Sequence, residues 1–198
     1  MKGEPRIAAI ILAAGASTRL GMPKQLIEHG GVPLVRRAAM AALEASADPV
    51  VVALGADNHE ILPALENLPR VRIALNSRWE LGLASSLSAG FAAVAAEADV
   101  GGALILLADQ PFIDSHTLRN LIAAFGEQRL VASAYSDTIG VPALIGREYF
   151  DELSALHGDR GAGPWLRGRM NEVQAIPLPA SPLDIDTPED VLRLRALD

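Results

Sequence analysis

The chain has 198 residues, of which 50% are hydrophobic and 21% charged, and its formal net charge is −7 at pH 7. This length and balance are typical of one globular domain, which we expect to span residues 1–198. The negative charge argues against a nucleic-acid-binding protein, because such proteins hold phosphates with clustered Lys and Arg. The absence of cysteine excludes disulfides and thiolate metal sites, and it favours a cytoplasmic protein.

The first apolar segment allows two interpretations. Lys2 and Arg6 precede an apolar run at Ile7–Ala14, and Ala14-Gly15-Ala16 resembles a small-residue cleavage site, which is the outline of a signal peptide. The same residues fit a buried first strand that leads into a phosphate-binding loop, and we favour this strand. No apolar run approaches the roughly 20 residues that a membrane span needs, so we expect no membrane partner.

Short apolar runs alternate with helical segments through the first half of the chain. The runs are continuous and lie at Ile7–Leu12, Val50–Leu54, Val71–Leu75 and Ala103–Leu107. Continuous runs are typical of parallel strands covered by helices on both faces. Helical patterns separate them at Pro33–Ala45, Asn58–Leu65 and Leu83–Ala96. The pattern predicts a single three-layer α/β/α domain with a mostly parallel, Rossmann-like sheet.

The second half follows the same theme less regularly. Asp114 or Ser115 is the expected cap of a helix that runs to about Gly126. The later predicted elements are strands at Leu130–Tyr135 and Pro142–Ile145, a helix at Glu148–Leu156, a loop at His157–Gly163, an apolar stretch at Val173–Leu178 and a last helix capped by Thr187. Ligands of such sheets bind outside the carboxyl ends of the strands, so the loops after Leu12, Leu75, Leu107 and Leu178 are the expected site.

The loop after the first strand carries groups suited to phosphate. Ala13, Ala14 and Gly15 leave backbone N–H groups open to an anion or a planar base. Arg19 offers a planar fork and Lys24 a mobile point charge, and together they suit a nucleoside triphosphate. The alternative is a tight turn with two solvated cations. The spacing matches neither the P-loop nor the G-x-G-x-x-G pattern, which disfavours a P-loop ATPase and a dinucleotide dehydrogenase.

Acidic residues follow two of the predicted buried segments. Asp109 comes directly after a strand, where a carboxylate points toward the ligand crevice. Asp184 and Asp186 lie on the same side of an extended segment, with Ile185 turned into the core. Mg²⁺ prefers a few carboxylates together with substrate phosphates. The alternative for these acids is helix capping or a turn, although Asp114 is better placed than Asp109 to cap the next helix.

These motifs resemble a known family. Leu12-Ala13-Ala14-Gly15, Arg19 and Pro23-Lys24-Gln25 resemble the signature of the MobA-like nucleotidyltransferases. The resemblance implies that a nucleoside triphosphate is bound by Leu12, Ala13, Ala14, Gly15, Arg19 and Lys24. It also implies that Mg²⁺ is held by Asp109 and Asp186, with Asp184 as a lesser candidate. Arg19, Lys24 and Asp109 are then the expected catalytic residues.

Four further stretches resemble the molybdenum cofactor cytidylyltransferases within that family, and they extend the resemblance over almost the whole chain. They lie at 76–87, 107–111, 158–162 and 184–190. These enzymes join CMP from CTP to molybdopterin and release pyrophosphate. The resemblance implies CTP and molybdenum cofactor as substrates, and a molybdoenzyme or its chaperone as the recipient of the product. Ala14 favours cytosine, because GTP-using relatives have a glycine there that leaves more room for a purine.

The remaining candidates have structural alternatives. Gly82 and Ser86 are expected to bind nucleotide, although a turn and a helix cap would also explain them. Asp159 and Arg160 are candidates for the acceptor, or else form an ion pair within a flexible loop. Trp79 is expected to pack rather than stack on a ligand. The alternative functions are transfer to another phosphorylated acceptor, use of GTP, or a non-catalytic chaperone that binds molybdopterin.

Overall fold

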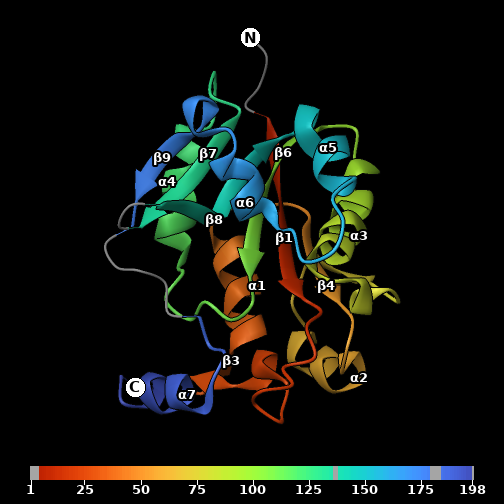
Figure 1. The fold of residues 1–198 in the computed structure, drawn as a ribbon, viewed down its shortest axis with the longest axis vertical. Coiled ribbons are helices and arrows are strands. Elements are labelled where there is room, and N and C mark those ends of the chain that lie inside the picture. The colour runs from red at the N-terminus through yellow and green to blue at the C-terminus, as the bar shows by residue number, and fades with distance from the viewer. Residues whose placement is uncertain (1–4, 136–137, 179–183, 198) are drawn as a thin grey trace.

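Strand β1 (Arg6–Ala13) lies inside a seven-stranded sheet in the computed structural model, which describes residues 5–135, 138–178 and 184–197 (Figure 1). The strand order is β5 (Val71–Leu75), β4 (Val50–Leu54), β1, β6 (Val100–Leu107), β8 (Thr138–Gly146), β7 (Leu130–Tyr135) and β9 (Gln174–Pro177). Strand β8 runs antiparallel to β6 and β7, and the other neighbours pair in parallel. The predicted mostly parallel sheet is confirmed.

Alternate residues of the inner strands enter two different cores. Ala9 and Ile11 of β1 pack on one face of the sheet, whereas Ala8 and Ile10 pack on the other, and all four are fully buried. The first face is covered by α1 (Leu34–Glu44), α2 (Asn58–Ile61) and α4 (Ser115–Ala124). The second face is covered by α3 (Leu83–Ala95), α5 (Phe150–Ser154) and α6 (Ala162–Arg167). Burial on both faces explains why these strands are continuously apolar.

Two helix starts follow their predicted caps. The Asp114 side chain accepts a hydrogen bond of 2.8 Å from the backbone N–H of Thr117 at the start of α4. Thr187 and Asp190 form a capping box at the start of α7 (Pro188–Arg195), in which each side chain accepts a bond from the other residue's backbone N–H. Asp114 is thereby used as a cap, as the sequence predicts, and Asp109 is not.

Strand β5 differs from its prediction as a strand covered on both faces. It lies at the edge of the sheet, with Arg72 and Ile73 exposed and Leu75 64% exposed. An edge strand has a neighbour on one side only, and the apolar run at 71–75 does not reveal its position in the sheet. The Arg72 guanidinium lies 2.5 Å from a Glu97 carboxylate oxygen, which places a charged pair at this edge.

Two predicted helices and one predicted loop need correction. The predicted helix at 58–65 is α-helical only to Ile61 and continues as the 3-10 helix η2 (Leu62–Leu65), because Pro63 has no N–H for an α-helical bond. The predicted helix at 148–156 begins as the 3-10 helix η4 (Arg147–Tyr149) and ends with α5 at Ser154. The predicted loop at 157–163 ends early, because α6 begins at Ala162.

A small hairpin was not predicted. Strands β2 (Glu28–His29) and β3 (Val32–Pro33) pair antiparallel across Gly30 and Gly31. Both glycines have positive φ, at 58° and 70°, which is the conformation that a two-residue hairpin turn requires. The Gly-Gly dipeptide was therefore an available signal for this turn.

The order of the strands places a crevice beside β1. From β1 the chain moves outward through β4 to β5 and then returns to β6 on the other side of β1 (Figure 1). The carboxyl ends of β1 and β6 are joined there by a bond of 3.2 Å from the Ala108 N–H to the Leu12 carbonyl. Ligands of open α/β sheets bind at such a reversal of strand order.

Two predicted features lie partly outside the described residues, namely Lys2 before the first strand and residues 179–183 of the loop after Leu178. The described residues 6–13 form β1, as the strand interpretation predicts. Within the described ranges, none of the helices has the length and apolar character needed to cross a membrane.

Candidate functional site

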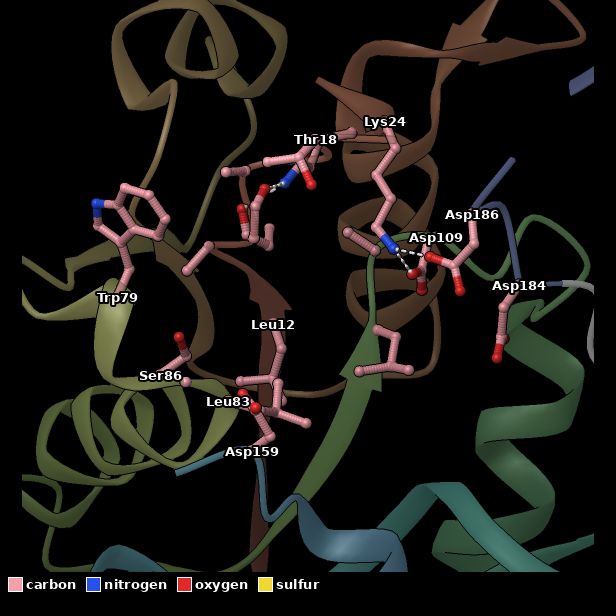
Figure 2. Close-up of a pocket in the computed structure, with 18 of the residues that line it drawn as sticks. Leu12, Thr18, Lys24, Trp79, Leu83, Ser86, Asp109, Asp159, Asp184 and Asp186 are labelled. Carbon is pink, nitrogen blue, oxygen red and sulfur yellow. Dashed lines mark hydrogen bonds and ion pairs between the residues drawn. The ribbon is translucent and has the colours of Figure 1, made fainter. Parts of the chain in front are cut away.

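A cavity of about 650 Å³ opens at the carboxyl ends of β1 and β6 (Figure 2). This volume is within the usual range of about 300–1,000 Å³ for small-molecule sites. The predicted site residues that line it are Leu12, Ala13, Ala14, Gly15, Arg19, Lys24, Gly82, Ser86, Asp109, Asp159 and Asp186. Arg160 is exposed and is absent from this lining, although it follows Asp159 in sequence. The structure thus brings together every predicted residue except Arg160.

The loop after β1 is held from inside by Gln25, which is 1% exposed. Its side-chain Nε2 donates bonds of 2.8 Å to the Ala13 carbonyl and 3.0 Å to the Gly15 carbonyl. The Ser17 hydroxyl accepts a bond of 3.0 Å from the backbone N–H of Lys24, which closes the loop from its other end. Gln25 thereby fixes two carbonyls on the inner side of the loop.

Lys24 lies between two carboxylates that come from distant parts of the chain. Its Nζ is 2.5 Å from Asp109 Oδ2 and 2.7 Å from Asp186 Oδ1 (Figure 2). The side chains of Lys24 and Asp109 are only 21% and 11% exposed, whereas that of Asp186 is 47% exposed. The sequence predicted that Lys24 faces phosphates, but in the structure it pairs with both predicted metal ligands.

The charges around Lys24 determine its protonation. Burial alone would lower the pKa of Lys24, but the ion pairs with Asp109 and then Asp186 outweigh it and hold the pKa above its ordinary value. Lys24 is therefore a cation at neutral pH. The other oxygen of Asp109, Oδ1, is buried and has no hydrogen-bond partner among the described residues. A buried carboxylate oxygen without a donor can accept a further cation or proton.

The segment before α7 carries two acids to the cavity. Ile185 is fully buried, and its backbone N–H donates a bond of 3.1 Å to the Asp109 carbonyl. As predicted, Ile185 turns inward, and Asp184 and Asp186 both line the cavity. Desolvation raises the pKa of Asp184, the charges of Asp109 and Asp186 raise it further, and a hydrogen bond of 3.0 Å from Gln110 opposes the change.

Trp79 lies on the opposite side of the cavity from Lys24 (Figure 2). A Cβ built on Gly55 would lie 2.5 Å from the Trp79 Cβ and 2.9 Å from the Ala14 Cβ. Only glycine therefore fits at residue 55, after β4, and its absence of a side chain lets Trp79 and Ala14 approach each other. Trp79 is half-buried, and it packs against Gly55 while it also forms a wall of the cavity.

The buried side chain of Asn76 organises the same wall. Its Oδ1 accepts a bond of 2.9 Å from the Arg78 N–H, and its Nδ2 donates to the hydroxyls of Ser85 at 2.8 Å and Ser86 at 3.1 Å. Ser86 is 4% exposed and lies within α3, so it is not the helix cap that the alternative interpretation suggested. Among the described residues no acceptor takes its hydroxyl hydrogen, which leaves a donor at the cavity.

Gly82 precedes α3 as its N-cap residue and has a φ of 94°, which favours glycine. A Cβ there would also lie 2.5 Å from Asp159 Oδ1 and 2.6 Å from the Gly158 carbonyl oxygen. That carbonyl accepts a bond of 3.0 Å from the Ala84 N–H. The predicted acceptor loop is therefore packed against the start of α3, at the base of the cavity.

The cavity contains more acids than cations. Its lining includes Arg19 and Lys24 and five carboxylates, those of Glu80, Asp109, Asp159, Asp184 and Asp186. An anionic ligand such as a triphosphate would need added positive charge here. No group of three or more His, Asp or Glu in the described part of the chain is arranged to hold a metal by itself. Two carboxylates that converge on one cation fit a metal that takes its other ligands from substrate and water.

The sequence did not predict the roles of Gln25 and Asn76 in holding the site. The Pro23-Lys24-Gln25 motif assigns no role to Gln25, and Asn76 is only the first residue of the stretch at 76–87. Both are buried polar side chains beside the site, Gln25 in the 3-10 helix η1 (Lys24–Leu26) and Asn76 after β5, and buried polar groups must find partners.

Known proteins share the family and the fold of this chain. The profile of the MobA-like NTP transferase domain matches residues 9–174, which is most of the chain. The chain belongs to the MobA-like NTP transferase family. The match of this family covers β1 from Ala9 onward, the loop with Lys24, and Asp109, and it ends before Asp186.

The relatives of this MobA-like protein are named for different activities. It is 33% identical to nicotine blue oxidoreductase of Paenarthrobacter nicotinovorans, over 96% of this chain and 97% of that protein. It is also 33% identical to 3-deoxy-manno-octulosonate cytidylyltransferase of Methylococcus capsulatus, over 87% of this chain and 68% of that enzyme. The crystal structure of Rv0371c from Mycobacterium tuberculosis is 29% identical, covers 96% of this chain and 97% of its own, and superposes with a TM-score of 0.83. A second Rv0371c structure is a complex with manganese.

Proposed function

We propose that this protein transfers the CMP group of CTP to the molybdenum cofactor, molybdopterin, with release of pyrophosphate. The observation that carries this proposal is the convergence of Lys24, Asp109 and Asp186 beside the glycine-containing loop after β1. A nucleotide base would lie toward Trp79 and Ser86, and its phosphates would follow the loop toward Lys24. Membership of the MobA-like family supports the reaction class, and a cytidylyltransferase among the relatives supports CTP.

In the proposed reaction a phosphate oxygen of molybdopterin attacks the α-phosphorus of CTP. A new P–O bond forms to the acceptor, the bond to the β-phosphate oxygen breaks, and its electrons leave with pyrophosphate. The attacking phosphate is already an anion, so the reaction requires no general base. Arg19 and Lys24 stabilise charge on the leaving group, and the backbone N–H groups at 13–15 orient the phosphates.

The acids of the cavity fit a divalent ion in this reaction. We assign Asp109 and Asp186 as its protein ligands, because their carboxylates converge on one cation and Asp109 Oδ1 lacks a donor. Mg²⁺ bound there would supply charge neutralisation to the reacting phosphates. Asp159 lines the same cavity and is the proposed contact for the acceptor. Arg160 follows it as a surface cation that an anionic acceptor could reach from outside the cavity.

Three other functions make different predictions. The first is a nucleotidyltransferase of the same fold that uses GTP in place of CTP or transfers the nucleotide to another phosphorylated acceptor. A non-catalytic chaperone would bind molybdopterin but has no need of two converging carboxylates. An oxidoreductase is suggested by the name of the relative from Paenarthrobacter nicotinovorans, which this chain matches along almost its whole length.

The test is pyrophosphate release by the purified protein with Mg²⁺ and molybdenum cofactor, in which CTP is compared with GTP, ATP and UTP. The proposal expects release that depends on the cofactor and is fastest with CTP. Release with another nucleotide alone would replace CTP, and release with another acceptor alone would replace molybdopterin. Oxidation or reduction of nicotine blue, without pyrophosphate release, would instead support the oxidoreductase. A finished product that stays bound until a molybdoenzyme or its chaperone is added would identify the recipient.

A further inference from the structure

The ammonium group of Lys24 lies where the proposed metal ion would bind. Its Nζ forms an ion pair with Asp109 at 2.5 Å and donates a charge-assisted hydrogen bond of 2.7 Å to Asp186. Figure 2 shows the Lys24 side chain directed at both carboxylates, on the side of the cavity opposite Trp79. Two carboxylate oxygens therefore converge on one cation, and that cation belongs to the protein.

The same ammonium group has a second task in the proposed reaction, which is to contact the phosphates. The Nζ atom of Lys24 cannot lie between Asp109 and Asp186 when a divalent ion is bound there. It must leave the carboxylates in order to contact the phosphates. The backbone of Lys24 is fixed by its N–H bond to Ser17 and by the buried neighbour Gln25. The four-carbon side chain is flexible, so a change of partner requires rotation of this side chain alone.

We propose that Lys24 is the resident cation of the ligand-free metal site and that the divalent ion competes with it for Asp109 and Asp186. This inference rests on the proposed function, because it takes the two carboxylates as the metal ligands. In the ligand-free protein the ammonium neutralises both acids. When the nucleotide and the metal bind, the metal replaces the ammonium between the carboxylates, and Lys24 turns to the phosphates.

Competition at one site makes the affinities for metal and nucleotide depend on each other. The metal alone must displace the Lys24 ammonium from two close carboxylates, so its binding is weak. A triphosphate gives the ammonium a new partner, and metal affinity increases by the same factor by which the metal increases nucleotide affinity. Arg19 is exposed, and no described carboxylate pairs with it, so it takes no part in this competition.

The test is a titration of ligand-free protein with Mn²⁺ followed by electron paramagnetic resonance, which counts free Mn²⁺ directly. Lys24→Met keeps the length of the side chain and removes its charge, and Arg19→Met is the matched control in the same loop. We expect Lys24→Met to bind Mn²⁺ more tightly than the wild type, on the order of tenfold, which is within the usual range of coupling between competing ligands. Arg19→Met should bind Mn²⁺ as the wild type does, and Asp186→Asn should bind it more weakly.

Thermal unfolding gives a second measurement that does not depend on activity. The melting temperature of Lys24→Met should rise more with added Mn²⁺ than that of the wild type, because the metal stabilises the folded state in proportion to its affinity. If Lys24→Met does not fold, Lys24→Gln removes the same charge and keeps a hydrogen-bond donor for the carboxylates.

Equal or weaker Mn²⁺ binding by the folded Lys24 variant would overturn the inference. Absence of Mn²⁺ binding by every variant, with and without CTP, would remove the metal site and overturn the inference together with the proposed function. Tighter binding by Lys24→Met in a protein that fails to transfer CMP would leave the inference intact and show that the proposed reaction is the part in error.

Discussion

The side-chain amide of Asn76 donates a hydrogen bond of 3.1 Å to the hydroxyl of Ser86, and both side chains are buried beside the cavity. Because Ser86 accepts from Asn76, its own hydrogen is available to a ligand. Asn76 is therefore a positioning residue that makes Ser86 a donor toward an oxygen or ring nitrogen of the nucleotide. A carboxylate at residue 76 would instead draw the Ser86 hydrogen away from the cavity.

The first prediction follows from this pair. Asn76→Asp and Ser86→Ala should each increase the KM for the nucleotide about tenfold, the effect of one lost hydrogen bond, with a smaller change in kcat. The double variant should be little worse than either single variant, because both changes remove the same donor. Ser88→Ala, on the same helix, is the control. Additive effects in the double variant would refute a shared role.

The second prediction concerns Gln25. Gln25→Ala should reduce the free energy of unfolding by about 1–3 kcal/mol, because the buried Ala13 carbonyl loses its donor. The KM for the nucleotide should increase as well, since the loop after β1 loses its inner support. Urea unfolding and steady-state kinetics measure the two effects. Gln128→Ala, in an exposed turn, should change neither.

The third prediction concerns Asp109. Asp109→Asn keeps the shape of the side chain and removes the charge that faces Lys24 and the proposed metal ion. Turnover should fall about a hundred- to a thousandfold, the usual loss when one group that stabilises the transition state is removed. Pyrophosphate release measures it, with circular dichroism as the test of folding. Asp151→Asn, an exposed aspartate on α5, serves as the control, and near-normal turnover of Asp109→Asn would exclude a catalytic Asp109.

The fourth prediction concerns the nucleotide base. The Ala14 methyl group faces Gly55 on the Trp79 side of the cavity, where the base is expected. Ala14→Gly should shift the ratio of kcat/KM from CTP toward GTP by about tenfold, because one methyl group in a pocket contributes that order of discrimination. Ala16→Gly introduces the same backbone freedom in the same loop and should leave the ratio unchanged. An unchanged ratio in Ala14→Gly would assign base choice to other residues.

The fifth prediction uses Tyr135, whose hydroxyl donates a hydrogen bond to the Val141 carbonyl. Burial, and then the charge of Asp184, raises the pKa of Tyr135 from 10.0 to about 12. The unfolded chain therefore loses this proton first as the pH rises, so the contribution of Tyr135 is complete below about pH 10 and is lost toward pH 12. Tyr135→Phe should show a smaller loss of stability over this range in urea unfolding. A loss equal to that of the wild type would contradict the assignment, and Tyr149→Phe is the control.

Much of the fold could be predicted because its signals are local. The apolar runs at Val50–Leu54 and Leu130–Tyr135 coincide with β4 and β7, since inner strands of a covered sheet are mostly apolar. The position of β5 at the sheet edge could not be predicted, because it depends on which strand lies beside it and not on its own residues.

The candidate site could be predicted as a set of residues but not as a set of contacts. The types and spacing of Lys24, Asp109 and Asp186 indicate phosphate and metal chemistry, and the position of each after a strand indicates one edge of the sheet. That Lys24 pairs with both acids depends on side-chain directions in the folded molecule, which the sequence does not contain. The same limit explains why the roles of Gln25 and Asn76 were missed.

The bond between Lys24 and Asp186 joins residues that are 162 positions apart in the chain. Asp186 reaches Lys24 because Ile185 is buried next to Asp109, whereas α7 that follows has a single fully buried residue, Leu194. A segment with so few buried contacts can detach at a lower free energy than the sheet needs to unfold. Mild denaturant should therefore open the site while the sheet remains folded, so that inactivation precedes the loss of β-structure.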